Sequence, residues 1–287
     1  MRLSVDISGI RSFVGDIAAL DMIKAAGFDA VDYSFHEHDI ATGENYLENA
    51  KNIREHLDKI GLVCNQAHAP FGLTYGKPFD ESNYQYLTIV RSIEAAAIMG
   101  ADNIIVHAIV VPEGIENVTD TYEDYNYKFY KSLEPVAKKF GIKIAIENLF
   151  TYNEINHYHN GVFAKPFEMN SLLARLDSPI FGTCLDIGHA FISGTKPHLF
   201  IAGMKPGALR ALHVQECTDG IGDKHMLPYL GFIDWESTAA ALKEYKYDGD
   251  ITFEIFKFFK CFPPECLEAA LKLAVSVGRH LIKLIEE

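Results

Sequence analysis

The chain has 287 residues and a formal net charge of −13, with 26 Lys and Arg against 39 Asp and Glu. This acidity argues against nucleic acid as a partner, because a general grip on phosphates needs basic side chains. The apolar content of 48% excludes extensive disorder. No stretch reaches about 18 apolar residues, so we expect no membrane-spanning helix. The first ten residues lack a secretory signal pattern. Five scattered cysteines without a CxxC pair indicate a reducing cytoplasm.

Short apolar runs alternate along the chain with longer amphipathic ones. The short runs predict strands over 3–7, 30–35, 62–67, 103–107, 143–147, 181–186, 208–214 and 251–256. The longer runs predict helices over 16–26, 47–60, 83–99, 125–140, 167–176, 235–245 and 263–287. Each of the first four helices is followed directly by Gly, which is typical of a helix end. The pattern is weaker over 191–206, where at most a short helix is expected.

The count of strands decides between two α/β architectures. Eight βα units in a chain of 287 residues predict one (β/α)₈ TIM barrel, a single domain over 1–287. An open, doubly wound sheet would use five or six strands more comfortably. The glycine-rich loops that hold phosphates in nucleotide-binding folds are also missing from the sequence.

Polar residues follow the predicted strands at the points where the strands end. From the third strand to the eighth, the ends carry His68, His107, Glu147, Asp186, His213 and Glu254. Chemistry in such a barrel gathers at the carboxyl ends of the strands, so we expect these side chains to converge. A lone strand-end His is more often a hydrogen-bonded rim residue. An acid inside an apolar strand is harder to explain without a partner or a metal, and Glu147 and Glu254 are of this kind.

Two further polar pairs lie beside these ends. His189 follows Asp186 by three residues across a strand-to-loop turn, so both can face one pocket. Asp223 and His225 are two apart, and in an extended segment they point the same way. An ordinary solvated loop pair is the alternative for these two. His, Asp and Glu are the residue types that bind divalent metals.

Two segments resemble a known family. Leu-Asp-Ile-Gly-His over 185–189 and Asp-Lys-His-Met-Leu-Pro-Tyr-Leu-Gly-Phe-Ile-Asp-Trp over 223–235 are similar to the sugar phosphate isomerase/epimerase branch of the xylose isomerase-like barrel superfamily. The tail over 247–254 fits the same branch, and the resemblance extends over essentially the whole chain. These motifs are specific for the superfamily and poorly specific for the substrate.

The resemblance implies a set of metal ligands. Ketose 3-epimerases of the superfamily hold one divalent metal, and the corresponding residues here are Glu147, Asp186, His213 and Glu254, with His189 contacting substrate. The related apurinic endonuclease family 2 holds a three-metal zinc cluster, and matching its pattern adds His68, His107, His189, Asp223 and His225. The chain departs from the endonuclease pattern after the seventh strand, where it reads His-Val-Gln-Glu-Cys-Thr-Asp-Gly over 213–220.

These residues lead us to expect a metal-dependent isomerase or epimerase of a sugar, sugar phosphate or polyol. One divalent ion (Mn²⁺, Mg²⁺, Co²⁺ or Zn²⁺) would stabilise an enediolate, and Glu147 and Glu254 would exchange the proton as acid and base. Up to three ions would fit the larger residue set. That set suits a zinc-dependent phosphoesterase or apurinic endonuclease-like hydrolase, which is the first alternative. An inosose dehydratase-like lyase is the second. A barrel that only binds sugar is disfavoured by the intact ligand set.

Substrate contacts beyond the metal ligands are expected from residues near strand ends. Lys257 and Trp235 are candidates for binding a small sugar or sugar phosphate, and the resemblance to ketose 3-epimerases, which have a substrate-binding Glu shortly after the first ligand Glu, adds Glu154. Phe71, Tyr75, Tyr152 and Phe191 are candidates, with Trp235, for an apolar wall against a sugar ring, although ordinary packing is the commoner role of such rings. The phenylalanines over 253–262 suit core packing or a contact between copies of the chain, so a homo-oligomer stays open.

Overall fold

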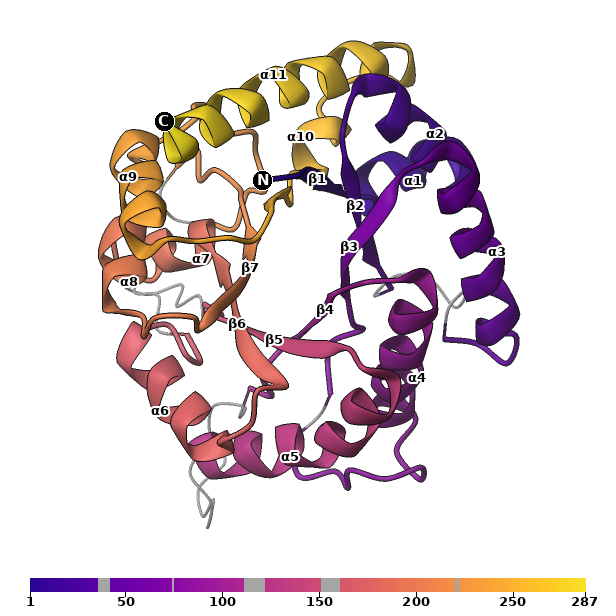
Figure 1. Cartoon of the computed structure of the whole chain (residues 1–287), viewed down its shortest axis with the longest axis vertical. Helices are drawn as coiled ribbons and strands as arrows, with labels where there is room; N and C mark the ends of the chain where they lie inside the picture. Colours follow the sequence, from indigo (N-terminus) through magenta and orange to yellow (C-terminus); the bar gives the residue numbers. More distant parts are fainter. Residues whose placement is uncertain (36–41, 74, 111–121, 151–160, 220–221) are drawn as a thin grey trace.

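The computed structural model describes residues 1–35, 42–73, 75–110, 122–150, 161–219 and 222–287. Its eight strands are parallel and form one sheet in the order β7-β6-β5-β4-β3-β2-β1-β8. A bridge between Val214 and Phe253 joins the two edge strands, so the sheet is a nearly closed barrel. Helices surround the strands as an outer ring (Figure 1). The TIM barrel expected from the sequence is thus confirmed.

Each predicted strand is present. The strands are β1 (Leu3–Asp6), β2 (Ala30–Ser34), β3 (Val63–His68), β4 (Asn103–Val106), β5 (Lys143–Glu147), β6 (Phe181–Asp186), β7 (Leu209–His213) and β8 (Ile251–Phe253). The eighth strand is shorter than predicted, because the chain turns into helix α10 at Phe256. Phe256, Phe258 and Phe259 therefore belong to a helix, where Phe258 and Phe259 are buried, and Phe262 follows the end of that helix.

The helices of the outer ring agree with the predicted ones apart from their ends and a few short additions. The longer helices are α2 (Asp16–Ala26), α3 (Tyr46–Ile60), α4 (Tyr84–Met99), α5 (Tyr122–Phe140), α6 (Pro166–Leu176), α9 (Trp235–Tyr245) and α11 (Leu267–Glu286). Gly27 (φ 105°) and Gly100 (φ 89°) end α2 and α4 in the left-handed conformation, as the sequence predicts. The last helix begins at Leu267 rather than 263, after a short 3₁₀ turn over Pro264–Cys266.

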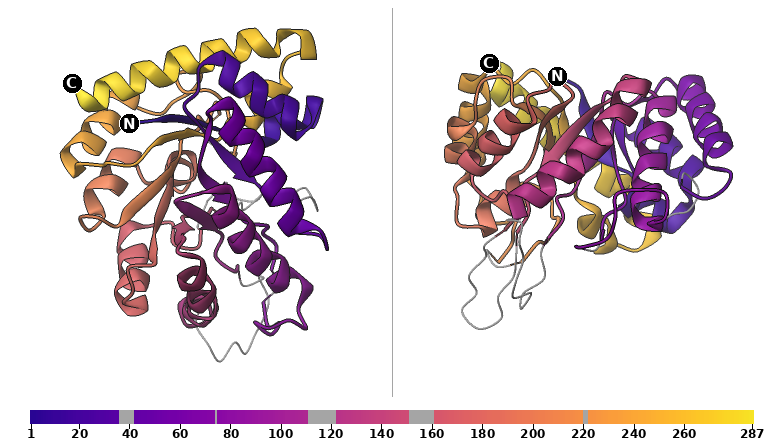
Figure 2. Two further views of the ribbon diagram at one scale, coloured as in Figure 1. Left: turned by 45° about the vertical axis from the view of Figure 1, so that its right-hand side comes forward. Right: turned by 90° about the horizontal axis from the view of Figure 1, so that it is seen from below.

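Four short helices of the described residues lie in the connections that follow β1, β6 and β8. They are α1 (Ser8–Val14), α7 (Ile187–Ile192), α8 (Pro197–Gly203) and α10 (Phe256–Lys260). Only the region of α8 carries even a weak helical signal in the sequence, because helices of five to seven residues have too few turns to show a period. In Figure 2 the strands run through the interior while the longer helices cover the outside. No described helix has the length and apolar character that crossing a membrane requires.

The barrel interior is layered. Ile105, Ala145, Cys184 and Ala211 form a separate apolar cluster, one residue from each of the strands β4 to β7. Residues two apart on a strand face the same side, so the next inward positions along the chain are His107, Glu147, Asp186 and His213. The strand period itself therefore places four of the predicted site residues in one layer at the carboxyl ends of the strands.

Candidate metal centre

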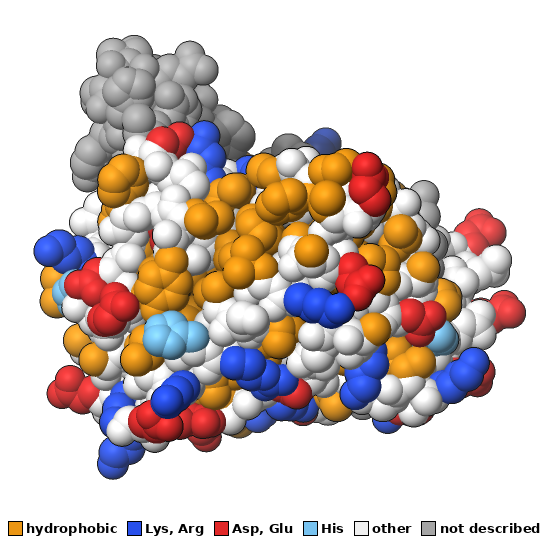
Figure 3. Space-filling view, turned by 90° about the horizontal axis from the view of Figure 1, so that it is seen from above, with side chains coloured by type: hydrophobic (Ala, Val, Ile, Leu, Met, Phe, Trp, Pro, Cys, Tyr) orange, Lys and Arg blue, Asp and Glu red, His pale blue; other side chains and the backbone are white. Residues whose placement is uncertain are grey.

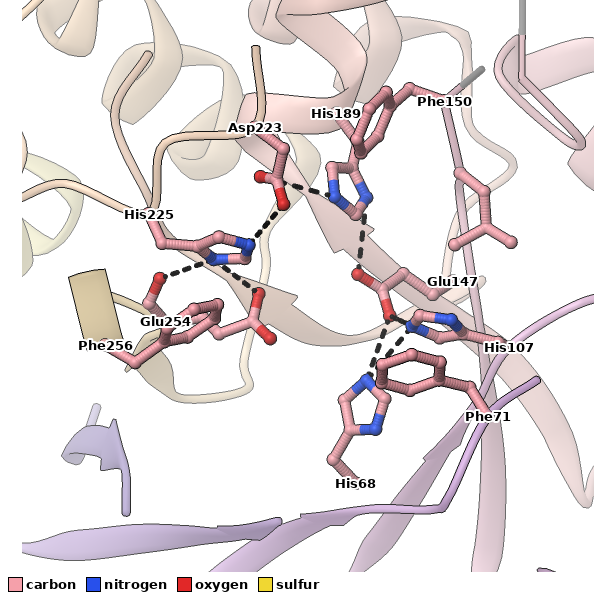
Figure 4. A pocket seen from close by; sticks show the side chains of 11 residues that line it. His68, Phe71, His107, Glu147, Phe150, His189, Asp223, His225, Glu254 and Phe256 are labelled. Atoms are coloured by element: carbon pink, nitrogen blue, oxygen red, sulfur yellow. Dashed lines mark hydrogen bonds and ion pairs between the residues drawn. The ribbon is translucent and has the colours of Figure 1, made fainter. Parts of the chain in front are cut away.

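A cavity of about 300 Å³ opens above this layer. It is lined by His68, Phe71, His107, Glu147, Leu149, Phe150, His189, Asp223, His225, Glu254 and Phe256. Figure 4 shows Glu147 between His107 and His189, while Asp223 bridges His189 and His225. The volume lies at the small end of the range for ligand pockets, which suits a small molecule.

Glu147 contacts several histidines of the site. Its Oε2 lies 2.9 Å from His107 Nε2 and 3.4 Å from His68 Nε2, and its Oε1 lies 3.1 Å from His213 Nδ1. The side chain is 1% exposed. Burial raises the pKa of Glu147, but the nearby His213 and His107 outweigh burial and bring this pKa well below its ordinary value. Glu147 is therefore held as a carboxylate inside the barrel.

Glu254 mirrors this arrangement at the end of β8. Its Oε2 lies 3.3 Å from His225 Nδ1 and 3.5 Å from His213 Nδ1. Burial raises the pKa of Glu254, but His213 and His225 dominate and lower it to about 2. His213 thus lies between two carboxylates that come from the ends of two different strands, β5 and β8.

Asp186 and His189 are placed together by a helix start. Asp186 ends β6 and its Oδ1 accepts a hydrogen bond of 2.6 Å from the backbone N–H of His189, which caps α7. His189 Nε2 lies 3.6 Å from Asp223 Oδ1 and 3.8 Å from Asp186 Oδ2. Burial, with Glu254, Glu147 and Asp223 close by, raises the pKa of Asp186 to about 7 despite His189.

The last pair lies on the connection after β7. Asp223 Oδ2 makes a short contact with His225 Nε2, and His225 Nδ1 lies 3.0 Å from the carbonyl oxygen of Glu254. Burial lowers the pKa of His225, but the carboxylates of Glu254 and Asp223 prevail and raise it to about 10. The predicted pair thus faces the cavity rather than solvent.

The residues fit divalent metal ions. Four groups bring ligand atoms within 4.8 Å of one another: Glu147–Asp186–His213–Glu254, His68–His107–Glu147, His189–Asp223–His225 and His68–His213–Glu254. Glu147 Oε2 and Glu254 Oε2 are buried and make no hydrogen bond of good geometry to any described residue, although imidazole nitrogens lie nearby. Buried carboxylate oxygens of this kind are what a cation would satisfy. All nine predicted ligand candidates belong to these groups.

The predicted substrate contacts are less uniform. Glu154 and Tyr152 lie outside the described residues. Lys257 Nζ contacts the carbonyl oxygen of Asp223 at the rim. Trp235 is placed elsewhere: it begins α9, is 3% exposed, and its Nε1 donates a 2.7 Å hydrogen bond to Glu216. It is held in the core by this bond.

The apolar wall of the cavity is built from other rings than those predicted, except for one. Phe71 lines the cavity and stacks on His107, with ring centroids 4.9 Å apart. Phe150 and Phe256, which are not among the rings expected from the sequence, pack on His189 and His225 at 4.8 and 4.0 Å. Each follows the end of a site strand by a few residues. Tyr75 and Phe191 are not among the described residues that line this cavity.

Two buried acids of the first strands are absent from the predicted site. Asp6 ends β1 and Asp32 lies within β2, with 2% and 1% exposure. Burial, then Asp32 and Glu254, raise the pKa of Asp6 to about 6. Asp32 contacts His213 directly, with 3.3 Å between its Oδ2 and the Nε2 of the imidazole. The sequence does carry a signal for it, because Asp32 stands in the strand Ala-Val-Asp-Tyr-Ser much as Glu147 stands in its own strand.

Known proteins share this fold. The family model of the xylose isomerase-like TIM barrel matches residues 20–275, and the chain belongs to this family. The uncharacterised protein MJ1311 of Methanocaldococcus jannaschii is 26% identical over 243 residues, which cover 83% of this chain and 78% of that protein.

Solved structures extend the comparison at lower identity. A D-tagatose 3-epimerase-like protein has a TM-score of 0.78 at 22% identity and covers 100% of this chain and 98% of its own. The IOLI protein with a bound zinc atom has a TM-score of 0.74 at 15% identity, with 100% and 98% covered. An AP endonuclease, family 2, from Brucella melitensis has a TM-score of 0.73 at 17% identity, with 96% and 98% covered. At these identities the likeness shows the fold.

Proposed function

We propose that this protein is a divalent-metal-dependent isomerase or epimerase of a small sugar or sugar phosphate. The observation that carries the proposal is the group Glu147–Asp186–His213–Glu254, buried at the carboxyl ends of β5 to β8 beneath a cavity of about 300 Å³. Three carboxylates and one imidazole suit Mn²⁺, Mg²⁺, Co²⁺ or Zn²⁺. Epimerases among the structures of the same fold support this choice of reaction.

A bound divalent ion would supply Lewis-acid stabilisation of the negative charge that develops next to a sugar carbonyl. The protein's own contribution is proton transfer. Glu147 and Glu254 reach the cavity from two strands, and their lowered pKa values keep each carboxylate able to accept a proton. One of them would remove the proton from the carbon beside the carbonyl. The other would first take up a proton from water and then deliver it to that carbon, while the first carboxyl would release its proton to water. The rings of Phe71, Phe150 and Phe256 would limit the access of water.

The test is solvent deuterium exchange into ketohexoses and their phosphates, with Mn²⁺ added. Glu147→Gln and Glu254→Gln should each lower deuterium incorporation by about 10²- to 10⁴-fold, the usual contribution of a general acid or base. Glu134→Gln, on the outer helix α5, is the control and should exchange as the wild type does. Undiminished exchange in both site variants would refute the acid–base pair.

A second function has a specific observation in its favour. The groups His68–His107–Glu147 and His189–Asp223–His225 flank the central group, and the first shares Glu147 with it. Histidine-rich ligand sets favour zinc, and two or three zinc ions would activate water for the hydrolysis of a phosphate ester. The net charge of −13 opposes docking of DNA. On the face shown in Figure 3, basic and acidic side chains are interspersed rather than gathered into one basic surface.

Elemental analysis of the purified protein separates the two functions. One equivalent of manganese or magnesium is expected for the isomerase. Two or three equivalents of zinc, together with cleavage of an abasic oligonucleotide or a simple aryl phosphate, would favour the hydrolase and overturn the first proposal.

A further inference from the structure

Both ring nitrogens of His213 face carboxylates. Nδ1 lies 3.1 Å from Glu147 Oε1 and 3.5 Å from Glu254 Oε2, whereas Nε2 lies 3.3 Å from Asp32 Oδ2. A neutral imidazole has one N–H and one lone pair, so the nitrogen that donates decides which one can bind a cation. The surroundings of Asp32 therefore bear on the metal centre, although Asp32 belongs to none of the four ligand groups.

A β-bulge brings Asp32 its own partner. Val31 pairs with Cys64 and Asp32 with Gln66, so that Asn65 is an extra residue on β3. The bulge lets two consecutive side chains of β3, Asn65 and Gln66, take part in hydrogen bonds inside the barrel. Gln66 Nε2 donates a 2.7 Å hydrogen bond to Asp32 Oδ2.

Further hydrogen bonds beyond Gln66 fix which atom of each side chain donates and which accepts. Asn65 Nδ2 donates to Thr252 Oγ1 at 3.2 Å, and Thr252 Oγ1 donates to Gln66 Oε1 at 3.1 Å. Ser4 Oγ donates to Asn65 Oδ1 at 2.7 Å, which orients that amide. Because Gln66 accepts at its oxygen, its NH₂ group points at Asp32. Asp32 is thus held as a hydrogen-bond acceptor by the interior of the barrel.

We propose that Asp32 is a positioning residue of the metal centre: its Oδ2 accepts the Nε2–H of His213 and leaves the Nδ1 lone pair facing Glu147, Asp186 and Glu254. The inference rests on the proposed metal site. When a cation occupies the site, the opposite tautomer would set the Nε2 lone pair against a carboxylate oxygen that already accepts from Gln66, and it would aim the Nδ1–H at the cation. Both contacts are repulsive. Outer carboxylates that orient a ligating imidazole in this way commonly tune metal affinity.

The first test uses the protein loaded with Zn²⁺, because without a cation the carboxylates of Glu147 and Glu254 themselves attract a proton to Nδ1. Long-range ¹H–¹⁵N spectra of the loaded protein, with ¹⁵N-labelled histidine, report which ring nitrogen carries the proton, and the spectrum of His213→Gln identifies the resonance. His213 is expected to carry its proton at Nε2. An Nδ1–H tautomer would overturn the proposal, whatever the fate of the proposed reaction.

The second test measures the affinity for Mn²⁺ and Zn²⁺ by competition with a chelator. Asp32→Ala should raise the Kd by about 10- to 100-fold, and Asp32→Asn, which keeps an acceptor oxygen, by less. Thr252→Val should give a smaller loss in the same direction, because it frees the Gln66 amide. Asp250→Asn, at the far end of the hydrogen bonds, is the matched control and should bind within about twofold of the wild type.

The outcomes are distinguishable. Unchanged affinity in Asp32→Ala, or an equal loss in Asp250→Asn, would overturn the positioning role. If Asp32→Ala does not fold by circular dichroism, then Asp32→Asn and Thr252→Val decide, and wild-type affinity in both would overturn it. A wild-type protein that binds no divalent metal would refute the proposed function, whereas wild-type metal affinity in both Asp32→Ala and Asp32→Asn would refute only the positioning role.

Discussion

The carboxyl and amino ends of the barrel interior are both polar, but their polar groups are matched differently. At the carboxyl end, Glu147 and Glu254 each keep a buried oxygen without a well-formed hydrogen bond to a described residue. At the amino end, the carboxylate of Asp250 and the amide of Asn65 meet complementary donors and acceptors, including the guanidinium of Arg2, although Asn103 Oδ1 and Arg210 Nε nearby are buried without a hydrogen bond to a described residue. The apolar cluster around Ala145 lies between them. Under the proposed function, the first end would receive a cation from solution, whereas the hydrogen bonds of Asn65 and Asp250 at the second end stabilise the fold itself.

The largest expected effect is the stabilisation of the carboxyl end of the barrel by a bound metal ion. A divalent ion at about 100 times its Kd should stabilise the wild-type protein by about 3 kcal/mol, and EDTA should reverse this. Asp186→Asn should lose that increment while remaining at least as stable as the wild type without metal at pH 8. The reason is that burial and Glu254 disfavour the charge of Asp186, whereas Asn still caps α7. Thermal unfolding with and without Mn²⁺ or Zn²⁺ measures both quantities. An unchanged metal increment would contradict the assignment.

A substitution at the amino end should lower the stability of the fold and leave metal binding unchanged. Asp250 accepts hydrogen bonds from the backbone N–H and Nε of Arg2 and from Asn65 Nδ2. Asp250→Asn should therefore lower the free energy of unfolding by about 2 kcal/mol. The metal increment should stay the same. Denaturant titration with and without metal checks this, and a variant that loses metal binding but not stability would reverse the comparison.

The pH dependence of the metal-free protein sharpens the contrast. The pKa of Asp186 rises from 3.8 to about 7 on folding, so between these values the folded protein keeps a proton that the unfolded chain has lost. The stability of the wild type relative to Asp186→Asn should therefore fall as the pH rises from about 4 to about 7, and stay constant above. Urea titrations of both proteins in EDTA at several pH values measure the difference. A difference that grows with pH in favour of the wild type would disprove the raised pKa.

The smallest expected effect on stability comes from the ion pairs of Glu134 on the outer helix α5. Lys131 and Lys138 each lie 2.7 Å from Glu134, and these bonds, Lys131 first, lower the pKa of Glu134 to about 2. The stabilisation that the Glu134 carboxylate gives to the folded protein is present above about pH 4.5 and is lost as the pH falls towards 2. Solvent screening at the exposed lysines should limit the cost of Glu134→Gln to about 0.5 kcal/mol at pH 7. A cost as large as that of Asp250→Asn would remove the distinction between exterior and interior pairs.

The sequence predicts the barrel well because its signals are local and repeated. Each strand is a short apolar run, and the polar residue at its end follows from a period of two around the small interior side chains such as Ala145 and Ala211. The same local pattern is enough to place His68, His107 and His213 at the carboxyl end of the barrel. Their chemical roles stay predictions.

What the sequence could not predict depends on contacts between distant segments. Trp235 was expected at the substrate, but its indole N–H pairs with Glu216, a partner 19 residues away that composition cannot reveal. Asp32 is absent from the predicted site although, like Glu147, it is an acid in an otherwise mainly apolar strand; it stands in the middle of β2, whereas Glu147 ends β5. The β-bulge at Asn65 also cannot be predicted from the sequence, because a register shift is defined only by the pairing with the neighbouring strand.

Glu216 has a consequence for binding kinetics. This fully buried carboxylate accepts hydrogen bonds from the backbone N–H groups of Cys217, Phe232 and Ile233 as well as from the Trp235 indole. It thereby ties both ends of the segment that carries Asp223 and His225 to the end of β7. The conformational entropy of these ends is lost when the protein folds, so little remains to be lost when a ligand arrives. Under the proposed function, the two described ends of this segment should therefore need no slow ordering step when an ion reaches Asp223 and His225.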